Sequence, residues 1–542
     1  MKSLSLEPRQ RALHSLQSET LDVLIIGGGI VGAGVARDAA MRGLKTGLVE
    51  QHDFAFGTSS RSSRLLHGGL RYLAQGRLGL VHEASVEKKI IHHIAPHLAE
   101  PLPFIFPAYR GNQTWVLWQL KIGVKIYDLL CGGRNLGKST WLNTDEVMCK
   151  VPSLSADGLN GAVRYYDGFT NDARLTLDTL RSAAKHGARL ANCCRFKNAK
   201  RVDVQTQPLT PSLSPSDTES MAEGRMRGNP QPTGMIAGEF WDCEVEDVLT
   251  RKTLPVQARN IVNATGPWAD GLPHSRVKLR LTKGIHLVVE RTKVPVPETV
   301  AMTEGKRILF AIPWGGRTIL GTTDTDYHGS LDDVTADASD LNYVLQITNQ
   351  FFPDAKLTAA DVISSWAGLR PLLADPNGKP SDISRSHEIT NPEPGWWDVA
   401  GGKLTTYRLM AEQAVDQIVK KLASPNHFKD CCTATEPLLP VVETENVSGI
   451  VPPEFTRGVV EHYVANEWAI HLDDVMVRRT SWHYYFPDAA EKAGHVADWM
   501  GGLLGWSQVQ HAAELQRYRA AVTGQSVRNA TELTPRRELT NR

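Results

Sequence analysis

Three glycines near the N-terminus have the spacing that a dinucleotide-binding turn requires. Gly27, Gly29 and Gly32 form the pattern G-x-G-x-x-G directly after residues 23–26, a short β-branched apolar run that predicts a buried strand. In such a turn the first glycine permits a sharp bend, the second lets the backbone approach a pyrophosphate, and the third lets a helix pack close to the strand. The spacing alone is a weak signal, because an ordinary strand–helix–strand unit can contain it.

Glu50 adds an independent signal to the glycine pattern. It follows a second predicted strand, residues 46–49, and lies 23 residues after Gly27. A carboxylate there can accept hydrogen bonds from the hydroxyls of an adenosine ribose. Between the two strands we expect a helix that ends near Arg42, with Gly43 as its left-handed C-cap. The N-terminus of this helix favours a pyrophosphate, so the stretch predicts a dinucleotide without deciding between FAD and NAD.

The next stretch, residues 54–73, gathers hydroxyl groups and arginines. Its polar residues include Thr58, Ser59, Ser60, Arg61, Ser62, Ser63, Arg64, His67, Arg71 and Tyr72. Hydroxyls, backbone N–H groups and guanidinium groups together can bind an anion. The stretch therefore predicts an anion-binding loop, although a solvated turn would explain the same composition.

The overall composition is that of an ordinary globular protein. The chain has 542 residues, of which 41% are hydrophobic and 22% are charged, and its formal net charge is +1. This length predicts about two to four domains. A net charge near zero creates no long-range field, which argues against a nucleic-acid partner. The seven cysteines are sparse and lack zinc spacing, so we expect reduced thiols in a cytosolic compartment.

No segment of the sequence predicts a membrane span or a secretory signal. The longest apolar runs fall short of the roughly 18 residues that a spanning helix needs. Residues 1–20 are polar, and we interpret them as a leader or a frayed helix. Any contact with a membrane should therefore involve one face of the protein.

One predicted helix, within residues 113–130, has two interpretations. Its large apolar residues recur at helical spacing and are Trp115, Trp118, Ile122, Ile126 and Leu129, with Lys121 and Lys125 nearby. Tryptophan and lysine on one helix can mark an interfacial membrane helix. We favour a helix packed on the core, because Gly123 interrupts the pattern and the polar face is thin.

Residues 206–238 differ in composition from the rest of the chain. They are rich in proline, serine, threonine and glycine and contain almost no bulky apolar residues. Such a segment cannot bury enough surface to offset its ordering entropy, so we predict a disordered surface insertion. It lies between strand-like pieces at residues 201–204 and 240–247, as an elongated hairpin tip would.

Several motifs together resemble one enzyme family. The stretch GGGIVGAGVARDAAMRGL, followed by FGTSSRSSRLLHGGLRYL, is similar to the FAD-dependent, quinone-linked glycerol-3-phosphate dehydrogenases, which share the fold of D-amino-acid oxidase and glycine oxidase. Later stretches resemble the same family in the same order, and they are VNATGPWAD (262–270), TKGIHLVV (282–289), FAIPWGGRTILGTTDTDY (310–327), AGLRPL (367–372), GGKLTTYR (401–408) and EWAIHLDDVMVRRT (467–480). The similarity extends from about residue 20 to about residue 520.

The resemblance implies an α/β fold with three parts. A Rossmann-type FAD-binding domain would span residues 21–425 discontinuously. A substrate domain at approximately 80–160 and 277–365 would interrupt it, and residues 277–330 do alternate apolar and polar as an antiparallel sheet does. We expect a C-terminal helical domain at 430–525 and a polar tail at 526–542.

The resemblance also implies which residues bind FAD. They come from the glycine turn, the hydroxyl-rich loop and two later small-residue turns. The predicted residues are Gly27, Gly28, Gly29, Ile30, Gly32, Glu50, Thr58, Ser59, Ser60, Leu66, Gly68, Gly69, Thr265, Gly266, Gly402, Lys403, Leu404 and Thr405.

The implied substrate is sn-glycerol 3-phosphate, which would be oxidised to dihydroxyacetone phosphate. A phosphate monoester carries close to two negative charges near neutral pH, so its site needs cations. Arg71, Arg370 and Lys403 lie in family motifs and are the predicted phosphate ligands, and Tyr72 could add a hydroxyl. Arg385 is a weaker candidate.

The catalytic base is harder to choose among 18 histidines. An imidazole suits proton removal at neutral pH. We prefer His286 as the base and place His67 near the flavin or the substrate. Arg370 could instead stabilise the developing alkoxide. No histidine or carboxylate pattern has metal-ligand spacing, so we expect no metal.

The resemblance further implies that electrons pass to a membrane quinone. The protein would then be cytoplasmic and would lie peripherally on the inner face of the cytoplasmic membrane. A homodimer is one possible oligomeric state. Two enzyme alternatives remain: an oxidase that uses O2, and an amine or amino-acid oxidase of the same fold. A flavin-bound module without catalysis is the alternative from another class, and it predicts a flavin that no polyol phosphate can reduce.

Overall fold

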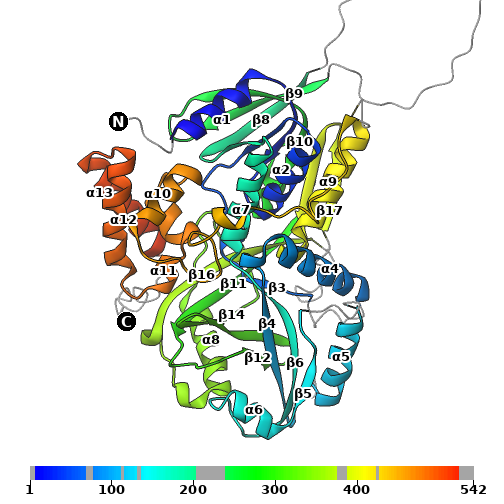
Figure 1. Cartoon of the computed structure of the whole chain (residues 1–542), viewed down its shortest axis with the longest axis vertical. Helices are drawn as coiled ribbons and strands as arrows, with labels where there is room; N and C mark the ends of the chain where they lie inside the picture. The colour runs from blue at the N-terminus through cyan, green and yellow to red at the C-terminus, as the bar shows by residue number, and fades with distance from the viewer. Residues whose placement is uncertain are drawn as a thin grey trace, which may run out of the picture.

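The computed structural model describes residues 6–68, 77–111, 115–130, 136–202, 239–374, 387–422 and 427–523. Two sheets and a set of C-terminal helices make up these parts of the chain (Figure 1). The arrangement confirms the predicted fold class, in which a Rossmann-type domain is joined to a largely antiparallel substrate domain and a C-terminal helical domain.

The first sheet is built around β1 (Leu21–Ile26), which pairs in parallel with β2 (Thr46–Val49) and β10 (Thr253–Asn263). The strand order is β17-β18-β10-β1-β2-β7, with β9 beside β10 and β8 beside β9. The other strands are β7 (Arg189–Ala191), β8 (Cys194–Val202), β9 (Phe240–Asp247), β17 (His387–Glu393) and β18 (Trp396–Gly401). Because β1, β2, β10 and β18 run parallel, their carboxyl ends lie along one edge of the sheet.

Three helices pack on this sheet through one apolar cluster. They are α2 (Ile30–Arg42), α7 (Asp172–Lys185) and α9 (Tyr407–Lys421). Helix α2 ends at Gly43 with φ +95°, which confirms the predicted left-handed C-cap.

The N-terminal helix α1 (Leu6–Ser18) is part of the first domain. Leu13 and Leu16 are buried against the sheet, and the buried Arg9 forms an ion pair with Asp247 at 2.7 Å. The interpretation of residues 6–18 as a leader or frayed helix is therefore wrong. The segment looked polar because it contains few apolar residues, of which Leu13 and Leu16 are buried.

The second sheet is centred on β11 (Leu279–Glu290) and β16 (Val362–Leu373), which pair antiparallel along almost their whole length. The order is β15-β11-β14-β13-β12-β4-β6-β3, with β16 also beside β11 and β5 beside β6. All its described pairs are antiparallel except β12 with β4. The other strands are β3 (Leu65–Leu66), β4 (Glu100–Tyr109), β5 (Thr140–Leu142), β6 (Leu159–Phe169), β12 (Thr299–Glu304), β13 (Arg307–Trp314), β14 (Arg317–Gly321) and β15 (Thr325–Asp326).

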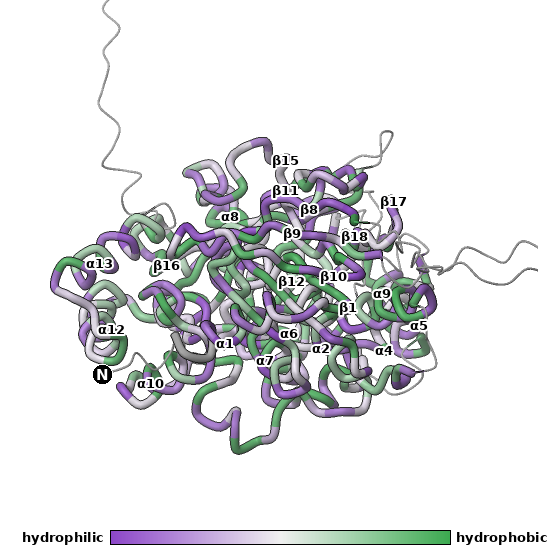
Figure 2. The backbone as a smooth tube through the Cα atoms, turned by 90° about the horizontal axis from the view of Figure 1, so that it is seen from above, coloured by the Kyte–Doolittle hydropathy of each residue, from purple (hydrophilic) through white to green (hydrophobic). Residues whose placement is uncertain are grey.

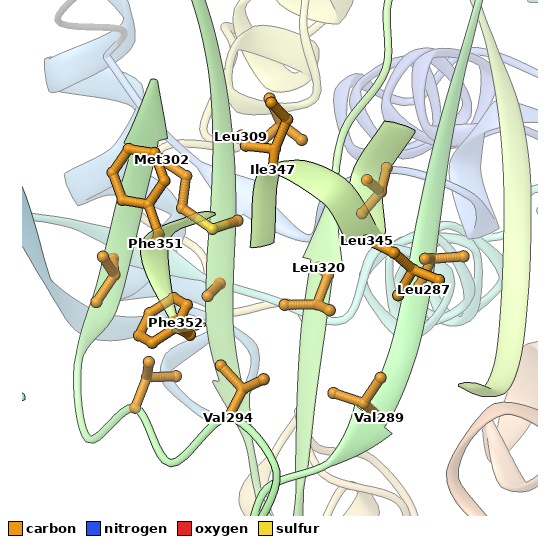
Figure 3. Packing of buried hydrophobic residues seen from close by; sticks show 14 of the residues in the cluster. Leu287, Val289, Val294, Met302, Leu309, Leu320, Leu345, Ile347, Phe351 and Phe352 are labelled. Atoms are coloured by element: carbon orange, nitrogen blue, oxygen red, sulfur yellow. The ribbon is translucent and has the colours of Figure 1, made fainter. Parts of the chain in front are cut away.

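Helix α8 (Ala338–Phe351) closes one face of this sheet. Its apolar residues share a cluster with side chains from β11, β12 and β14, and Figure 3 shows Leu345 beside Leu287 and Phe351 beside Met302. This core supports β11 and β16 from behind, on the side away from the first sheet. The helices α4 (Leu78–Ile94), α5 (Leu117–Leu130) and α6 (Thr144–Lys150) flank the strands β4, β5 and β6.

Helix α5 lies at the margin of the molecule, as Figure 2 also shows. Its buried residues are Leu120, Val124 and Tyr127. Of the residues that we expected to pack on the core, Trp115 is buried at 7% exposed, but Trp118, Ile122 and Leu129 face outward at 60%, 52% and 76% exposed. The prediction of a core-packed apolar stripe is wrong for these residues, because the helix is apolar on both faces and helical spacing does not say which face is buried. None of the described helices combines the length and the apolarity that crossing a bilayer would require.

The C-terminal domain consists of short helices around a separate core. Val460, Tyr463, Trp482 and Met500 lie in this core. The helices are α10 (Arg457–Asn466), the π-helix η9 (Asp474–Arg479), α11 (Trp482–Tyr485), α12 (Ala489–Leu504) and α13 (Gln508–Thr523). The short 3-10 helices of the chain are η1 (Thr58–Ser60), η2 (Pro96–Leu98), η3 (Gly266–Gly271), η4 (Pro353–Ala355), η5 (Ala359–Asp361), η6 (Leu404–Thr406) and η8 (Val441–Glu443).

Buried ion pairs join the C-terminal domain to the first domain. Arg174 of α7 donates to both carboxylate oxygens of Glu467, at 2.6 and 2.9 Å. Asp53, which follows β2, accepts hydrogen bonds from Arg478 and Arg479. These groups are less than 5% exposed, so buried ion pairs form part of this interface, together with ring contacts such as that of Phe54 with Trp468.

The strands that flank the predicted insertion pair with each other. Strands β8 and β9 are antiparallel, with Val202 opposite Phe240. This pairing agrees with the expected hairpin. The predicted insertion itself, residues 206–238, and the tail, residues 526–542, lie outside the described residues, and the domain boundaries stay a prediction.

We expect Glu467→Gln to lower the free energy of unfolding by about 3 kcal/mol or more, because losing one member of a buried ion pair leaves the other charge uncompensated. Burial alone would raise the pKa of Glu467, but Arg174, His462 and Arg181 hold this pKa well below its ordinary value. The stabilisation is therefore complete above the unfolded-state pKa of about 4.3 and is lost as the pH falls through the folded-state pKa.

Denaturant unfolding at pH 7 and pH 3 measures this effect, and the difference between variant and wild type should be smaller at pH 3. Glu461→Gln is the matched control, since Glu461 pairs with Arg457 on the surface of the same domain. It should cost less than about 1 kcal/mol. Equal losses in the two variants would contradict the assignment of the interface to buried ion pairs.

Candidate active site

A cavity of about 460 Å³ lies between the two sheets. One wall consists of the ends of β1, β2, β10 and β18 and the turns that follow them. The opposite wall comes from β11 and β16, through residues such as His286 and Arg370. The cavity is therefore located where ligands of open parallel sheets bind, outside the carboxyl ends of the strands.

The glycine turn forms the first part of the wall. Gly27 has φ +108°, and a Cβ atom there would lie 2.6 Å from the carbonyl oxygen of Ala264. A Cβ atom at Gly32 would lie 2.0 Å from the carbonyl oxygen of Gly27, so helix α2 reaches the strand only because both residues are glycine. Gly29 and Ile30 line the cavity at the N-terminus of α2.

The carboxylate of Glu50 lies on the same wall. It accepts hydrogen bonds from the backbone N–H groups of Gly28 at 2.7 Å and His52 at 2.8 Å. Burial raises the pKa of Glu50 to about 7, although both N–H groups act in the opposite direction. Each oxygen still has a lone pair that can accept from a ribose hydroxyl, as the sequence predicted.

The hydroxyl-rich loop connects the two sheets at this point. Ser59 accepts a hydrogen bond from the N–H of Ile30 at 2.9 Å, at the start of α2. Thr58 donates to the carbonyl oxygen of Leu369 on β16 at 2.7 Å. The loop thus holds the glycine turn and the substrate sheet in fixed relation.

The remaining predicted FAD residues on this wall follow β10 and β18. Thr265 and Gly266 lie at the start of η3, and Gly402 and Lys403 lead into η6, which begins with Leu404 and Thr405. All of them line the cavity. Thr405 accepts a hydrogen bond from the N–H of His67 at 3.1 Å, so the second turn also fixes the loop that contains His67.

Five predicted FAD residues do not line the cavity: Gly28, Gly32, Ser60, Leu66 and Gly68. Ser60 and Leu66 are buried with their side chains packed inward. Gly28, Gly32 and Gly68 support the wall through close backbone packing. Gly69 lies outside the described residues.

His286 lies on β11, in the wall of the cavity that faces the glycine turn. Its Nε2 atom is 2.8 Å from Ser63 Oγ, and its ring stacks on Trp366 with ring centroids 5.2 Å apart. Burial, followed by the positive charges of Arg370 and Arg64, lowers the pKa of His286 to about 3. The imidazole is therefore neutral at physiological pH.

Arg370 lies on β16 beside His286. Its guanidinium donates to Thr322 Oγ1, to the carbonyl oxygen of Thr323 and to Asp324 Oδ1, at 3.1 to 3.2 Å. These bonds orient the cation against Gly284 on β11. His67 and Lys403 also line the cavity, so four predicted substrate residues converge. Arg71, Tyr72 and Arg385 lie outside the described residues, and their roles stay predictions.

Two neighbouring residues of the site were not assigned from the sequence. Ser63 is the hydrogen-bond partner of His286. Arg64 is 1% exposed, lies over the rings of Trp314 and Trp366 at 4.5 and 5.1 Å, and donates to Ser481. The sequence predicted that the loop containing them binds an anion. It did not show which side chains of the loop point toward the site, because that depends on how the loop folds.

The sequence matches two family models. The model described as FAD dependent oxidoreductase matches residues 22–220 and 233–416. The model described as C-terminal domain of alpha-glycerophosphate oxidase matches residues 445–511.

Two curated relatives have the same name, aerobic glycerol-3-phosphate dehydrogenase. The protein of Bacillus subtilis is 39% identical over 438 residues, which cover 79% of this chain and 73% of the relative. The protein of Staphylococcus saprophyticus is 31% identical over 576 residues, which cover 96% and 97%. The second alignment therefore extends over almost the whole of both chains.

Solved structures show the same relationship. A glycerol-3-phosphate dehydrogenase from Bacillus halodurans complexed with FAD has a TM-score of 0.69 and 26% identity, covering 97% of this chain and 99% of its own. An L-alpha-glycerophosphate oxidase from Mycoplasma pneumoniae, with a TM-score of 0.53 and 17% identity, covers 74% and 95% and shares the fold. The chain belongs to the FAD-dependent oxidoreductases and, within them, to the family of FAD-dependent glycerol-3-phosphate dehydrogenases.

Proposed function

We propose that this protein oxidises sn-glycerol 3-phosphate to dihydroxyacetone phosphate in the cavity between the two sheets and that a membrane quinone receives the electrons. The observation that carries the proposal is the cavity itself. A dinucleotide-binding wall faces a wall with a neutral imidazole and a fixed guanidinium. These are the groups that a redox reaction of a phosphorylated alcohol needs.

The residues of the first wall fit FAD. The glycine turn and the N-terminus of α2 would hold the pyrophosphate, and Glu50 would hold the ribose. The turns at Thr265–Gly266 and Gly402–Thr405 are backbone surfaces that a flat ring can approach. FAD, when bound, supplies the two-electron acceptor for hydride from the substrate carbon.

Two cations that line the cavity would bind the phosphate. Lys403 and Arg370 both line the cavity, and Arg370 is held in place by three hydrogen bonds. A preorganised cation binds a dianion without a further loss of side-chain freedom. We retain Arg71, Tyr72 and Arg385 as proposed additional ligands on the basis of the family resemblance.

His286 and His67 are the proposed proton acceptors. The lowered pKa of His286 keeps its imidazole in the neutral form that a base requires, and a phosphate dianion bound nearby would counteract the cations that lower this pKa. Ser63 would orient the ring through Nε2. We keep His286 as the preferred base and assign His67, which lines the same cavity, to substrate contact.

The outer face of α5 supports a peripheral location on the inner face of the cytoplasmic membrane. Trp118, Ile122 and Leu129 are exposed there, next to Trp141, which is 58% exposed. Lys121 and Lys125 lie 5.5 and 5.8 Å from the ring of Trp141. Exposed apolar and aromatic side chains beside lysines fit an anionic bilayer surface, where a quinone acceptor would be available.

Anaerobic addition of glycerol 3-phosphate should bleach the visible absorption band of the bound flavin. Hydride transfer from the secondary alcohol is the reason, and absorption spectroscopy of the FAD-loaded protein is the measurement. A water-soluble quinone should then restore the band at least about tenfold faster than air does. A band that glycerol 3-phosphate leaves unchanged would sink the proposed reaction, and faster recovery in air would identify an oxidase.

Lys403→Met should raise the KM for glycerol 3-phosphate by about 10- to 100-fold, because a charge-assisted hydrogen bond is worth about 1.5–3 kcal/mol. Steady-state kinetics with an artificial acceptor measures this change. Lys252→Met is the control, since Lys252 is exposed in the β9–β10 turn, and its KM should equal that of the wild type. If the KM of Lys403→Met is also unchanged while flavin is retained, Lys403 does not bind phosphate.

The double variant Trp118→Ser/Leu129→Ser should bind vesicles that contain phosphatidylglycerol at least about tenfold more weakly than the wild type. The loss of exposed apolar area is the reason, and co-flotation with vesicles is the measurement. Val441→Ser/Val442→Ser removes two side chains that are 75% and 81% exposed elsewhere, and it should bind normally. Similar binding by both double variants would exclude α5 as the membrane face.

A further inference from the structure

A buried polar cluster lies behind the turn at His67–Gly68. It consists of Lys88 on α4, Tyr127 on α5 and Asp167 near the end of β6, which are 1%, 0% and 2% exposed. None of the three lines the cavity. Polar groups this deeply buried are costly unless their hydrogen bonds are satisfied, so their location requires an explanation.

The three side chains meet at one oxygen atom. Asp167 Oδ1 accepts from Lys88 Nζ at 2.8 Å and from the hydroxyl of Tyr127 at 2.5 Å. The N–H of Gly68 donates to the Tyr127 hydroxyl at 3.1 Å and to Asp167 Oδ1 at 3.3 Å. The lysine compensates the carboxylate, and the phenol and the carboxylate together hold one backbone amide.

The preceding amide is held by a different element. The N–H of His67 donates to Thr405 Oγ1 at 3.1 Å, and Thr405 belongs to the flavin-side turn. Just upstream, β3 pairs with β6, and the carbonyl oxygen of Arg64 accepts from the N–H of Thr170 at 2.9 Å. The backbone that precedes Gly68 is therefore fixed on both sides.

The packing at Gly68 leaves no room for adjustment. A Cβ atom built there would lie 2.4 Å from the Tyr127 hydroxyl oxygen and 2.9 Å from Cε2 of the same ring. The phenol thus acts both as a hydrogen-bond partner and as a steric stop. A shift of Gly68 would also move the neighbouring His67, which lines the cavity.

We propose that Tyr127 and Asp167 are positioning residues for the reaction. They fix the backbone at His67–Gly68 so that His67 is presented to the substrate, and Lys88 forms an ion pair with Asp167 at 2.8 Å. The proposal rests on the proposed function, since it concerns the same cavity. Displacing a reacting group by about 1 Å can cost about 100-fold in rate, which is why so much buried polar structure can serve one amide.

The test is anaerobic stopped-flow reduction of the full-length, FAD-loaded protein by glycerol 3-phosphate. Tyr127→Phe should lower the limiting rate of flavin reduction by about 10- to 100-fold, while bound flavin and the KM change less than about threefold. Tyr463→Phe is the matched control, because Tyr463 is also fully buried and its hydroxyl donates to the carbonyl oxygen of Val447 in the C-terminal domain. It should reduce at the wild-type rate even if its Tm falls equally.

A second pair of variants examines the steric contact. Gly68→Ala should slow reduction more than Tyr127→Phe does. Gly68→Ala/Tyr127→Phe should be faster than Gly68→Ala alone, because the 2.4 Å contact with the hydroxyl is removed and only the longer contacts with the ring carbons remain. Losses that simply multiply, or a Tyr127→Phe rate equal to that of the wild type, would overturn the proposal. A wild-type flavin that glycerol 3-phosphate does not reduce would instead reject the proposed function.

Discussion

The hydrogen bonds of one loop, residues 57–68, hold the active site together. Ser59 joins this loop to the start of α2, Thr58 joins it to β16, and Ser63 joins it to His286 on β11. Further along, the N–H groups of His67 and Gly68 are bound by η6 and by the Tyr127–Asp167 pair. The two walls of the cavity come from different sheets, and these hydrogen bonds connect one to the other.

The electrostatics of the cavity follow from what this loop buries. Arg64 is 1% exposed and has Asp172 at 3.9 Å as its nearest described carboxylate. Together with Arg370 it lowers the pKa of His286, after burial as the larger cause. Arg370 therefore places a cation beside a neutral imidazole, in a cavity whose described lining also contains the carboxylates of Glu50, Asp172 and Asp270. The cost of burying Arg64 is partly offset by two tryptophan rings that face its guanidinium.

The C-terminal domain contributes to the same region from outside. Ser481 accepts a hydrogen bond from Arg64, and the carbonyl oxygen of Tyr484 accepts from Ser364 on β16. The Tyr484 ring lies 5.0 Å from that of Trp366, which stacks on His286. The ion pairs of Glu467 and Asp53 keep this domain docked. The domain therefore supports the rear of the substrate wall although it supplies no residue to the cavity lining.

The sequence by itself determined the dinucleotide-binding unit and the family. The glycine turn, the C-cap Gly43 and Glu50 all belong to one strand–helix–strand unit, residues 21–50, within which Glu50 accepts a hydrogen bond from Gly28. The motifs around His286, Arg370 and Lys403 were sufficient to predict that these side chains share one cavity. Nothing in the sequence singled out Tyr127 or Asp167. A tyrosine on a helix and an aspartate on a strand are common, and only the fold brings these two side chains to Gly68.

Only the tertiary structure decided which faces are buried. Helix α5 is apolar on both sides, so its period could not show that Trp118 faces outward and Tyr127 inward. The sequence of helix α1 is typical of a polar leader, and only the structure shows that Arg9 forms a buried ion pair with Asp247, which is distant in the chain. Burial and ion pairing depend on contacts between residues that are far apart in the sequence. A local pattern shows which residues can make such contacts, but it does not identify their partners.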